Sequence, residues 1–197
     1  MSAARLVVPA GHHPLPRADG SLPTKITYLT MRRASALDTR PPPSAGHLEL
    51  VHIERPSCSF YRFLYDSVGR PWLWYERKLV PDEAVEQHLQ NADNELHLLS
   101  VDHEPAGFFQ LDFTHGSTAE LEFFGLRPEF IGLGLGRWFL GRAIARAWQR
   151  PIVRLDVNTN TLDHPGALGL YRRCGFEIER TADALLQDPR VLWPELY

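Results

Sequence analysis

The sequence predicts a single-domain α/β fold built on one mixed, mostly antiparallel sheet, and two observations lead to this prediction. First, three segments with strand character, 96–101, 107–113 and 118–126, follow one another with only turn residues between them, as in an antiparallel meander. Second, residues 136–180 then change between helical and strand periods, in the order helix, strand, helix, strand. Strands that alternate with helices indicate a sheet whose faces are covered by helices.

The elements before the meander follow from local signals. Residues 24–31 alternate polar and apolar side chains, which suits a strand, and residues 48–53 read as a second strand. Residues 59–68 are rich in aromatic side chains and end at Gly69, which predicts a helix with a glycine stop. Pro81, followed by two acidic residues, predicts the start of another helix, because proline is tolerated in the first turn and carboxylates favour the dipole there.

The later elements and the prolines predict the domain organisation. An amphipathic helix is expected over 136–149, a strand over 152–158, a short helix over 165–173 closed by Gly175, and a strand over 176–180. Three consecutive prolines at 41–43 predict a stiff linker, so the main domain is expected to begin near His47. The four expected regions are an irregular segment (1–23), an extra strand with a Pro-rich linker (24–46), the main domain (47–181) and a C-terminal extension (182–197).

The composition is that of an ordinary globular protein. The 197 residues are 44% hydrophobic and 23% charged, and the formal net charge of −3 gives no electrostatic reason to expect a nucleic acid as partner. Cys58 and Cys174 are far apart and show no metal-type spacing, which indicates a reducing compartment. No apolar run reaches the length of a signal peptide or a membrane span. We therefore expect a cytoplasmic protein with no membrane partner. No metal is expected either, because the histidines form no ligand set.

A glycine-rich turn is the strongest local signal of function. Gly132, Gly134 and Gly136 lie between a predicted strand and a predicted helix, where the first N–H groups of a helix are free to bind an anion. Arg137 supports this interpretation, because a cation in the first turn costs an isolated helix about 0.3–1 kcal/mol unless an anion lies nearby. The turn lacks the Gly-Lys-Ser/Thr end of a Walker loop, and Arg137 occupies the position of the third glycine in a dinucleotide fingerprint. The alternative is a turn that only allows close packing of helix on sheet.

Residues 120–176 resemble the GNAT superfamily of N-acetyltransferases. Its signature turn, Gln/Arg-x-x-Gly-x-Gly/Ala, falls on residues 131–136, with Ile131 in place of the usual polar residue. Its short helix ending in Tyr-x-x-x-Gly-Phe is matched by residues 171–176, about forty residues later. The Thr-Leu-Asp-His-Pro segment at 161–165 is similar to a bacterial subgroup of the superfamily. The resemblance extends over residues 47–181 and implies the acyl-CoA N-acyltransferase fold.

This resemblance implies acetyl-CoA as cosubstrate, bound in a cleft where a central pair of parallel strands, 121–126 and 152–158, splays apart between flanking helices. The backbone at Leu126 and Arg127 would pair with the pantetheine arm as an added strand does. His164 stands where many members carry Asn, and it could still hydrogen-bond the pantetheine. The residues expected to contact the cofactor are Leu126, Arg127, Ile131, Gly132, Leu133, Gly134, Leu135, Gly136, Arg137, Asn158, His164 and Tyr171.

The chemistry requires a neutral amine, a stabilised oxyanion and a proton for the departing thiolate. Glu120 and Glu122 are two apart on one predicted strand and so face the same way, and their like charges would raise the pKa of at least one carboxyl group. Glu120 better matches the usual catalytic glutamate of the superfamily. The choice between the two stays open, as does the alternative of two solvated carboxylates. Tyr171 matches the usual general acid, and the alternative is a packing tyrosine. Cys174 has no base beside it and is expected to be buried and inert.

The acceptor side would be formed by two aromatic segments, 60–65 and 72–75, which wall the acceptor pocket in the superfamily. The expected acceptor contacts are Tyr61, Tyr65, Trp72 and Trp74. So many rings indicate an apolar or aromatic amine or a partner surface, and core packing is the equal alternative. A row of arginines at 142, 146 and 150 is either a site for the 3′-phosphate of CoA or a solvated helix face.

The predicted function is transfer of an acetyl group from acetyl-CoA to the amine of a small molecule or peptide, by direct attack in a ternary complex. One alternative is a non-catalytic acyl-CoA-binding regulatory module, and another is a nucleotide-binding oxidoreductase fragment. The strand at 24–31 is expected to pair either with the sheet edge or with a second subunit, which leaves a homodimer open.

Overall fold

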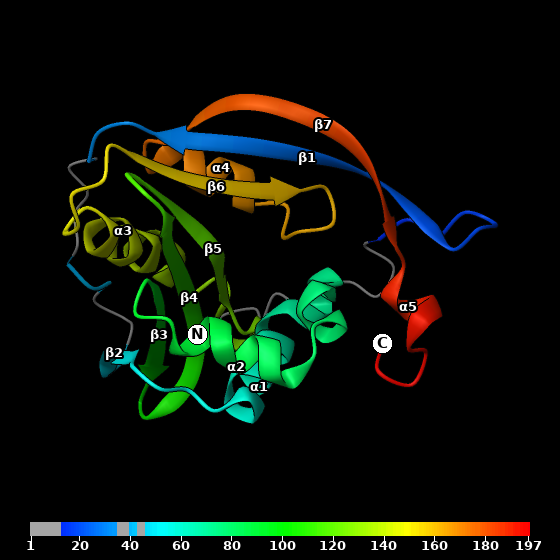
Figure 1. The fold of residues 1–197 in the computed structure, drawn as a ribbon, viewed down its shortest axis with the longest axis horizontal. Coiled ribbons are helices and arrows are strands. Elements are labelled where there is room, and N and C mark those ends of the chain that lie inside the picture. Colours follow the sequence, from blue (N-terminus) through cyan, green and yellow to red (C-terminus); the bar gives the residue numbers. More distant parts are fainter. Residues whose placement is uncertain (1–12, 35–39, 43–45) are drawn as a thin grey trace, which may run out of the picture.

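One seven-stranded sheet organises the molecule, in the order β2-β3-β4-β5-β6-β1-β7 (Figure 1). The computed structural model describes residues 13–34, 40–42 and 46–197. The strands are β1 (Ser21–Met31), β2 (Leu48–Ile53), β3 (Asn94–Val101), β4 (Glu104–His115), β5 (Thr118–Leu126), β6 (Arg154–Asn160) and β7 (Glu177–Gln187). All neighbours are antiparallel except β5 and β6, which are parallel. The predicted mixed sheet and its β3-β4-β5 meander are confirmed.

Helices cover both faces of the sheet. They are α1 (Cys58–Gly69), α2 (Asp82–Gln90), α3 (Leu135–Ala147), α4 (Ala167–Arg173) and α5 (Pro189–Leu192), with the short 3-10 turns η1 (Arg70–Trp72), η2 (Glu76–Leu79) and η3 (Pro128–Phe130). Alternation along β4 divides the core: Phe109 packs in the cluster formed with α3 and α4, and Phe108 packs in the cluster formed with α1 and α2. Across the described ranges no helix is long and apolar enough to cross a membrane.

The N-terminal strand is an internal member of the sheet. Residue Leu29 of β1 pairs with Val157 of β6 on one side and with Ile178 of β7 on the other. Leu29 and Met31 are 1% and 2% exposed in the main core cluster. The sequence left open pairing with the sheet edge or with a second subunit. The strand instead pairs within the sheet of its own chain, and it lies between β6 and β7 and not at an edge.

Three local expectations are changed by tertiary contacts. β7 extends to Gln187, beyond the predicted end at 180, because it pairs along the length of β1. Gly69 is not a left-handed helix stop, since α1 continues into η1 through Arg70 in the right-handed region. A Cβ atom at Gly69 would instead lie 2.4 Å from the side chain of Trp74, so glycine is needed there for close packing. Part of the predicted N-terminal segment and linker (1–12, 35–39 and 43–45) lies outside the described residues.

Candidate active site

A cleft opens where β5 and β6 separate. The two strands pair only from Thr118 and Arg154 to Glu120 and Asp156, although β5 continues to Leu126. The cleft beyond the last pair has a volume of about 540 Å³ and is lined by both strands, the glycine turn, α4 and part of the segment 68–77. The Asn158 side-chain nitrogen lies 3.5 Å from the Glu120 carboxylate across the gap.

The glycine turn ends at the cleft and leaves backbone donors unused. Gly132 and Gly134 have φ angles of 86° and 79°, a region that side chains with a Cβ atom rarely adopt. Gly134 directly precedes α3, and no side chain caps that helix. Within the described part of the chain, the N–H groups of residues 134–137 have no hydrogen-bond acceptor. Free N–H groups at the start of a 13-residue helix form a site suited to an anion.

The predicted cofactor residues divide into two groups. Those that line the cleft are Leu126, Ile131, Gly132, Gly136, Asn158, His164 and Tyr171, whereas Arg127, Leu133, Gly134, Leu135 and Arg137 do not line it. Arg127 is engaged elsewhere: its side chain pairs with Glu104 at 2.9 Å, and its backbone N–H donates to the Ala106 carbonyl at 2.8 Å. That N–H group is therefore not available to a pantetheine chain.

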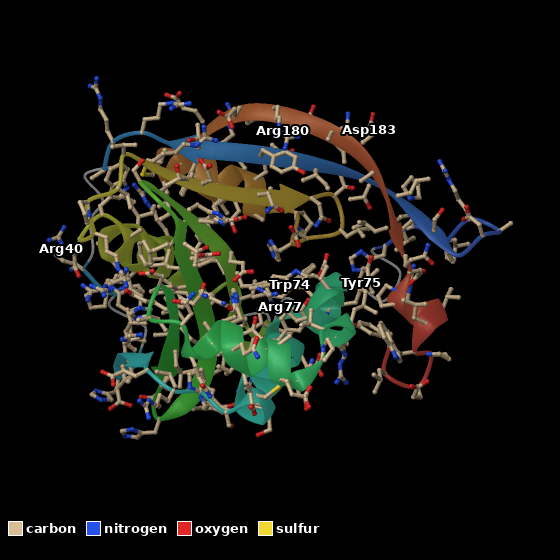
Figure 2. The ribbon with its side chains drawn as sticks, viewed as in Figure 1. Arg40, Trp74, Tyr75, Arg77, Arg180 and Asp183 are labelled. Carbon is tan, nitrogen blue, oxygen red and sulfur yellow. The ribbon has the colours of Figure 1, made fainter. Side chains whose placement is uncertain are left out.

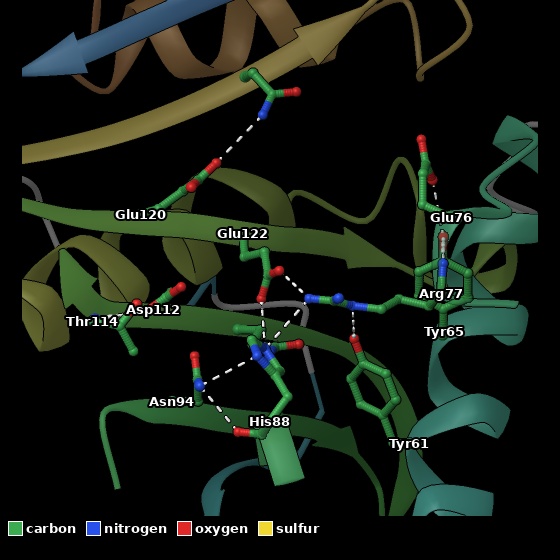
Figure 3. Close-up of polar contacts among 12 residues, drawn as sticks. Tyr61, Tyr65, Glu76, Arg77, His88, Asn94, Asp112, Thr114, Glu120 and Glu122 are labelled. Atoms are coloured by element: carbon green, nitrogen blue, oxygen red, sulfur yellow. Dashed lines mark hydrogen bonds and ion pairs between the residues drawn. The ribbon is translucent and has the colours of Figure 1, made fainter. Parts of the chain in front are cut away.

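Two basic side chains, Arg77 and His88, hold the Glu122 carboxylate. β4 pairs Leu111 with Leu121 and the preceding Gln110 with Phe123, so Glu122 is the extra residue of a β-bulge. Its carboxylate forms an ion pair with Arg77 and lies 3.1 Å from His88 Nε2 (Figure 3).

Glu120 is the carboxylate that remains available. In the described structure it has no ion pair, and Asn158 donates a hydrogen bond to it. Burial raises the pKa of Glu120, and the neighbouring Glu122 carboxylate raises it further. A partly buried carboxyl group with a raised pKa, at the point where two strands separate, suits a general base.

Tyr171 projects from α4 into the cleft lining. Its ring packs against Phe124 and Phe176 at centroid distances of 6.2 and 5.8 Å, and the side chain is 6% exposed. Burial, and then the charge of Asp163, raise the pKa of Tyr171, so the phenol stays protonated. Its hydroxyl group has no hydrogen-bond partner among the residues that the structure describes. The adjacent Cys174 is fully buried, and burial raises the pKa of its thiol, which disfavours a nucleophilic thiolate.

The four predicted acceptor residues take two different places. Trp72 and Trp74 line the cleft, where Trp74 Nε1 donates to Asp163 at 3.0 Å. Trp74 and Tyr75 lie in the loop between η1 and η2, and Arg77 follows in η2, next to α1 and α2 (Figure 2). Tyr61 and Tyr65 are 0% and 1% exposed and lie in the core behind the lining. Their hydroxyl groups support this loop: Tyr61 accepts from Arg77 at 3.3 Å and Tyr65 donates to Glu76 at 3.1 Å.

Six polar residues around the cleft were not predicted from the sequence. They are Glu76, Arg77, His88, Asn160, Asp163 and Arg173. Arg77 and His88 belong to separate elements and share no sequence motif, so nothing in the sequence signals that they meet at Glu122. Asp163 had a signal, since it lies within the Thr-Leu-Asp-His-Pro segment. It accepts from Thr159 Oγ1 at 2.8 Å and from the Asn160 N–H at 2.9 Å, and so shapes the loop before α4.

A second polar cluster lies on β2 and β3, outside the residues that line the cleft. Within the described ranges, His52, Glu95 and His97 form the one group with ligand atoms close enough for a metal ion, all within 4.8 Å. Arg146 and Arg150 bind both oxygens of the Glu95 carboxylate at 2.7–2.9 Å. Two guanidinium groups already supply positive charge there, which disfavours a cation. Of the two alternatives for the arginine row, the solvated face is therefore wrong for Arg146 and Arg150, which bind Glu95.

The fold and the cleft together define a class of protein. A mixed sheet whose parallel pair separates beside a glycine turn at a helix N-terminus is the acyl-CoA N-acyltransferase fold. Residues 51–176 match the Acetyltransferase (GNAT) family, and the chain therefore belongs to that family. Members of this family use acetyl-CoA to acetylate amines. The sequence matches no curated protein.

Solved structures agree with this fold. A GCN5-related N-acetyltransferase from Kribbella flavida is 18% identical with a TM-score of 0.55, over 84% of this chain and 58% of that chain. An IAA acetyltransferase from Bacillus cereus is 18% identical with a TM-score of 0.51, over 68% of this chain and 79% of that one. A transcriptional regulator from Bacillus halodurans is 26% identical with a TM-score of 0.52, over 68% of this chain and 95% of that one. This chain covers 52–64% of the first four similar structures.

Proposed function

We propose that this protein is an N-acetyltransferase that moves an acetyl group from acetyl-CoA to an amine by direct attack in a ternary complex. The observation that carries the proposal is the set of N–H groups at residues 134–137, which have no acceptor among the described residues and lie next to a cleft that contains an available carboxylate, Glu120. A diphosphate on those N–H groups would direct the thioester arm along the gap between β5 and β6. The free backbone edge of β5 beyond Glu120 would then pair with the arm as an added strand does.

The roles of the side chains follow from what each one can do with a proton. Glu120, directly or through a water molecule, takes a proton from the ammonium form of the acceptor, because its carboxylate has no competing cation within the described chain. The neutral amine attacks the thioester carbonyl carbon, a C–N bond forms, and the C–S bond then breaks. Tyr171 gives its phenolic proton to the departing thiolate and is reprotonated by the proton that the attacking nitrogen loses as the amide forms, while Glu120 releases its own proton to solvent.

The proposal is tested by measuring CoA release from acetyl-CoA with a panel of small amines, polyamines, amino acids and peptide N-termini. Glu120→Gln and Tyr171→Phe should each lower kcat for the best amine while CoA still binds by calorimetry. Unchanged turnover in both variants would contradict the assigned roles. Tight binding of CoA without transfer to any amine would instead indicate an acyl-CoA-binding regulatory module. Absence of CoA binding would contradict the proposal altogether.

A further inference from the structure

The cleft carries more negative charge than its own cations balance. Its lining includes four carboxylates, Glu76, Glu120, Glu122 and Asp163, and two guanidinium groups, Arg77 and Arg173. Arg77 is neutralised by its ion pair with Glu122. In the described part of the chain, the other three carboxylates have no ion pair with a basic side chain. One of them, Glu120, would contact the reacting amine under the proposed function.

The two remaining carboxylates are both linked to the acceptor-side loop that carries Trp74. Asp163 accepts hydrogen bonds with both oxygens, from Trp74 Nε1, Thr159 Oγ1 and the Asn160 N–H. Glu76 accepts with Oε2 alone, from the Tyr65 hydroxyl and the Tyr75 N–H, at 3.1 and 3.3 Å. Its Oε1 atom has no bond to the described residues, and the side chain is exposed. Glu76 is thus a charged group with an open oxygen at the cleft.

We propose that the acceptor carries a second positively charged group, which binds Glu76 beside the indole of Trp74 while the reacting amine lies at Glu120. This proposal rests on the proposed acetyltransferase function and narrows its acceptor to diamines, polyamines or amines with a guanidinium group. A carboxylate next to an aromatic ring binds a cation by a charge-assisted hydrogen bond together with contact with the ring. A neutral aromatic amine would form no charge-assisted hydrogen bond with Glu76.

A structural role for Glu76 makes a different prediction. If Glu76 only fastens its loop, then the two hydrogen bonds to Oε2 are its whole purpose and its charge is irrelevant. The Glu76→Gln variant keeps a carbonyl oxygen that can accept both bonds and removes only the charge. This variant therefore separates recognition of a cation from support of the loop.

The test compares 1,5-diaminopentane with 1-aminopentane, which share one carbon chain and differ in the second cation. For the wild-type full chain, kcat/KM for the diamine should exceed that for the monoamine by about tenfold or more, well beyond the factor of two expected from its second amine. Glu76→Gln should remove most of this preference by raising KM for the diamine, with little change for the monoamine. Glu86→Gln, on the exposed face of α2 and outside the cleft lining, is the matched control and should keep the preference.

The outcomes distinguish failure of this proposal from failure of the acetyltransferase function on which it rests. If both amines are acetylated with equal kcat/KM, or if Glu76→Gln affects both equally, the second-cation proposal is overturned while the acetyltransferase function stands. If neither amine is acetylated, calorimetry with the CoA complex decides: tighter binding of the diamine that is lost in Glu76→Gln supports the proposal, and equal or absent binding overturns it. Failure to bind CoA would instead remove the function itself.

Discussion

The two ends of the cleft are built by different means. The end next to α3 and α4 presents backbone N–H groups from one continuous turn, and Tyr171 lies on a short helix closed by Gly175 at a φ angle of 101°. The end next to α1 and α2 presents side chains that meet from several elements: Arg77 from η2, His88 from α2 and Glu122 from β5. The first end needs local geometry that a motif can encode. The second needs the whole fold.

This difference matches what each end would recognise under the proposed function. A diphosphate is the same in every reaction with CoA, and backbone donors at a helix start can bind it whatever the side chains are. The acceptor varies, and side chains on a loop between two helices can change without disturbing the sheet. We therefore expect substitutions at the two ends to separate the binding of CoA from the binding of the acceptor.

The largest expected effect lies at the junction of the two ends. Glu120→Gln keeps the size and the hydrogen bond to Asn158 but cannot accept the amine proton, so kcat should fall by about 10² to 10³-fold. The Kd of CoA, measured by calorimetry, should stay within about twofold, because no charge at the turn changes. A kcat within threefold of wild type would show that another group is the base.

At the acceptor end, Arg77→Met should weaken both stability and acceptor binding. The variant leaves the half-buried Glu122 carboxylate without its ion pair and removes a donor to the Tyr61 hydroxyl, which should cost about 2 kcal/mol of unfolding free energy. The KM for the acceptor should rise while the Kd of CoA does not change. Denaturant unfolding and steady-state kinetics measure these effects, with Arg142→Met, an exposed arginine on α3, as control. An equal loss of CoA affinity would mean that the two ends are not independent.

At the cofactor end, Gly132→Ala should weaken CoA binding by about tenfold through backbone strain. Gly116 provides a matched control: both glycines have positive φ angles, 86° and 69°, and a Cβ atom at either would meet nothing within 4 Å. Both alanine variants should lose about 1 kcal/mol of unfolding free energy. Only Gly132→Ala, in the cleft lining, should raise the Kd of CoA. A similar rise for Gly116→Ala would assign the effect to general destabilisation.

The same contrast explains how much could be predicted from the sequence. The strand meander and α3 follow from periodicity and glycine positions, which act over a few residues, whereas the parallel pair was expected only from the family resemblance. The place of β1 between β6 and β7 depends on pairing across more than a hundred residues, as in Leu29 with Val157, and no local pattern states it. Gly69 shows the same limit, because glycine is needed there for contact with the Trp74 ring and not to end the helix.

The candidate site divides in the same way. Glu120, Tyr171 and part of the glycine turn were identified from motifs, and the structure brings them to one cleft. Tyr61 and Tyr65 were expected to contact the acceptor but lie in the core, since an aromatic run on an amphipathic helix does not show which rings are covered. The ion pair of Arg77 with Glu122 could not be found from sequence, because charged residues carry no signal of their partners.

The smallest effect tests whether the acceptor end tunes the base. In the proposed mechanism Glu120 acts as a carboxylate, so activity is expected to fall as the pH drops through its raised pKa. The groups that act on it are Glu122, Asp112, Asp156 and His115, and of these Glu122 contributes the largest charge effect. Glu122→Gln removes this negative charge, so the pKa of Glu120 should fall and the acidic limb of the kcat/KM profile should move to lower pH.

The matched control for this shift is Glu129→Gln, which removes a carboxylate of η3 that does not line the cleft. Its pH profile should coincide with that of the wild type. If Glu122→Gln lowers activity equally at every pH, then Glu122 serves the loop through Arg77 and His88 alone. A shift to lower pH without a change in the Kd of CoA would show that the acceptor end acts on the base through charge. The two ends would then remain separate in binding and meet only at Glu120.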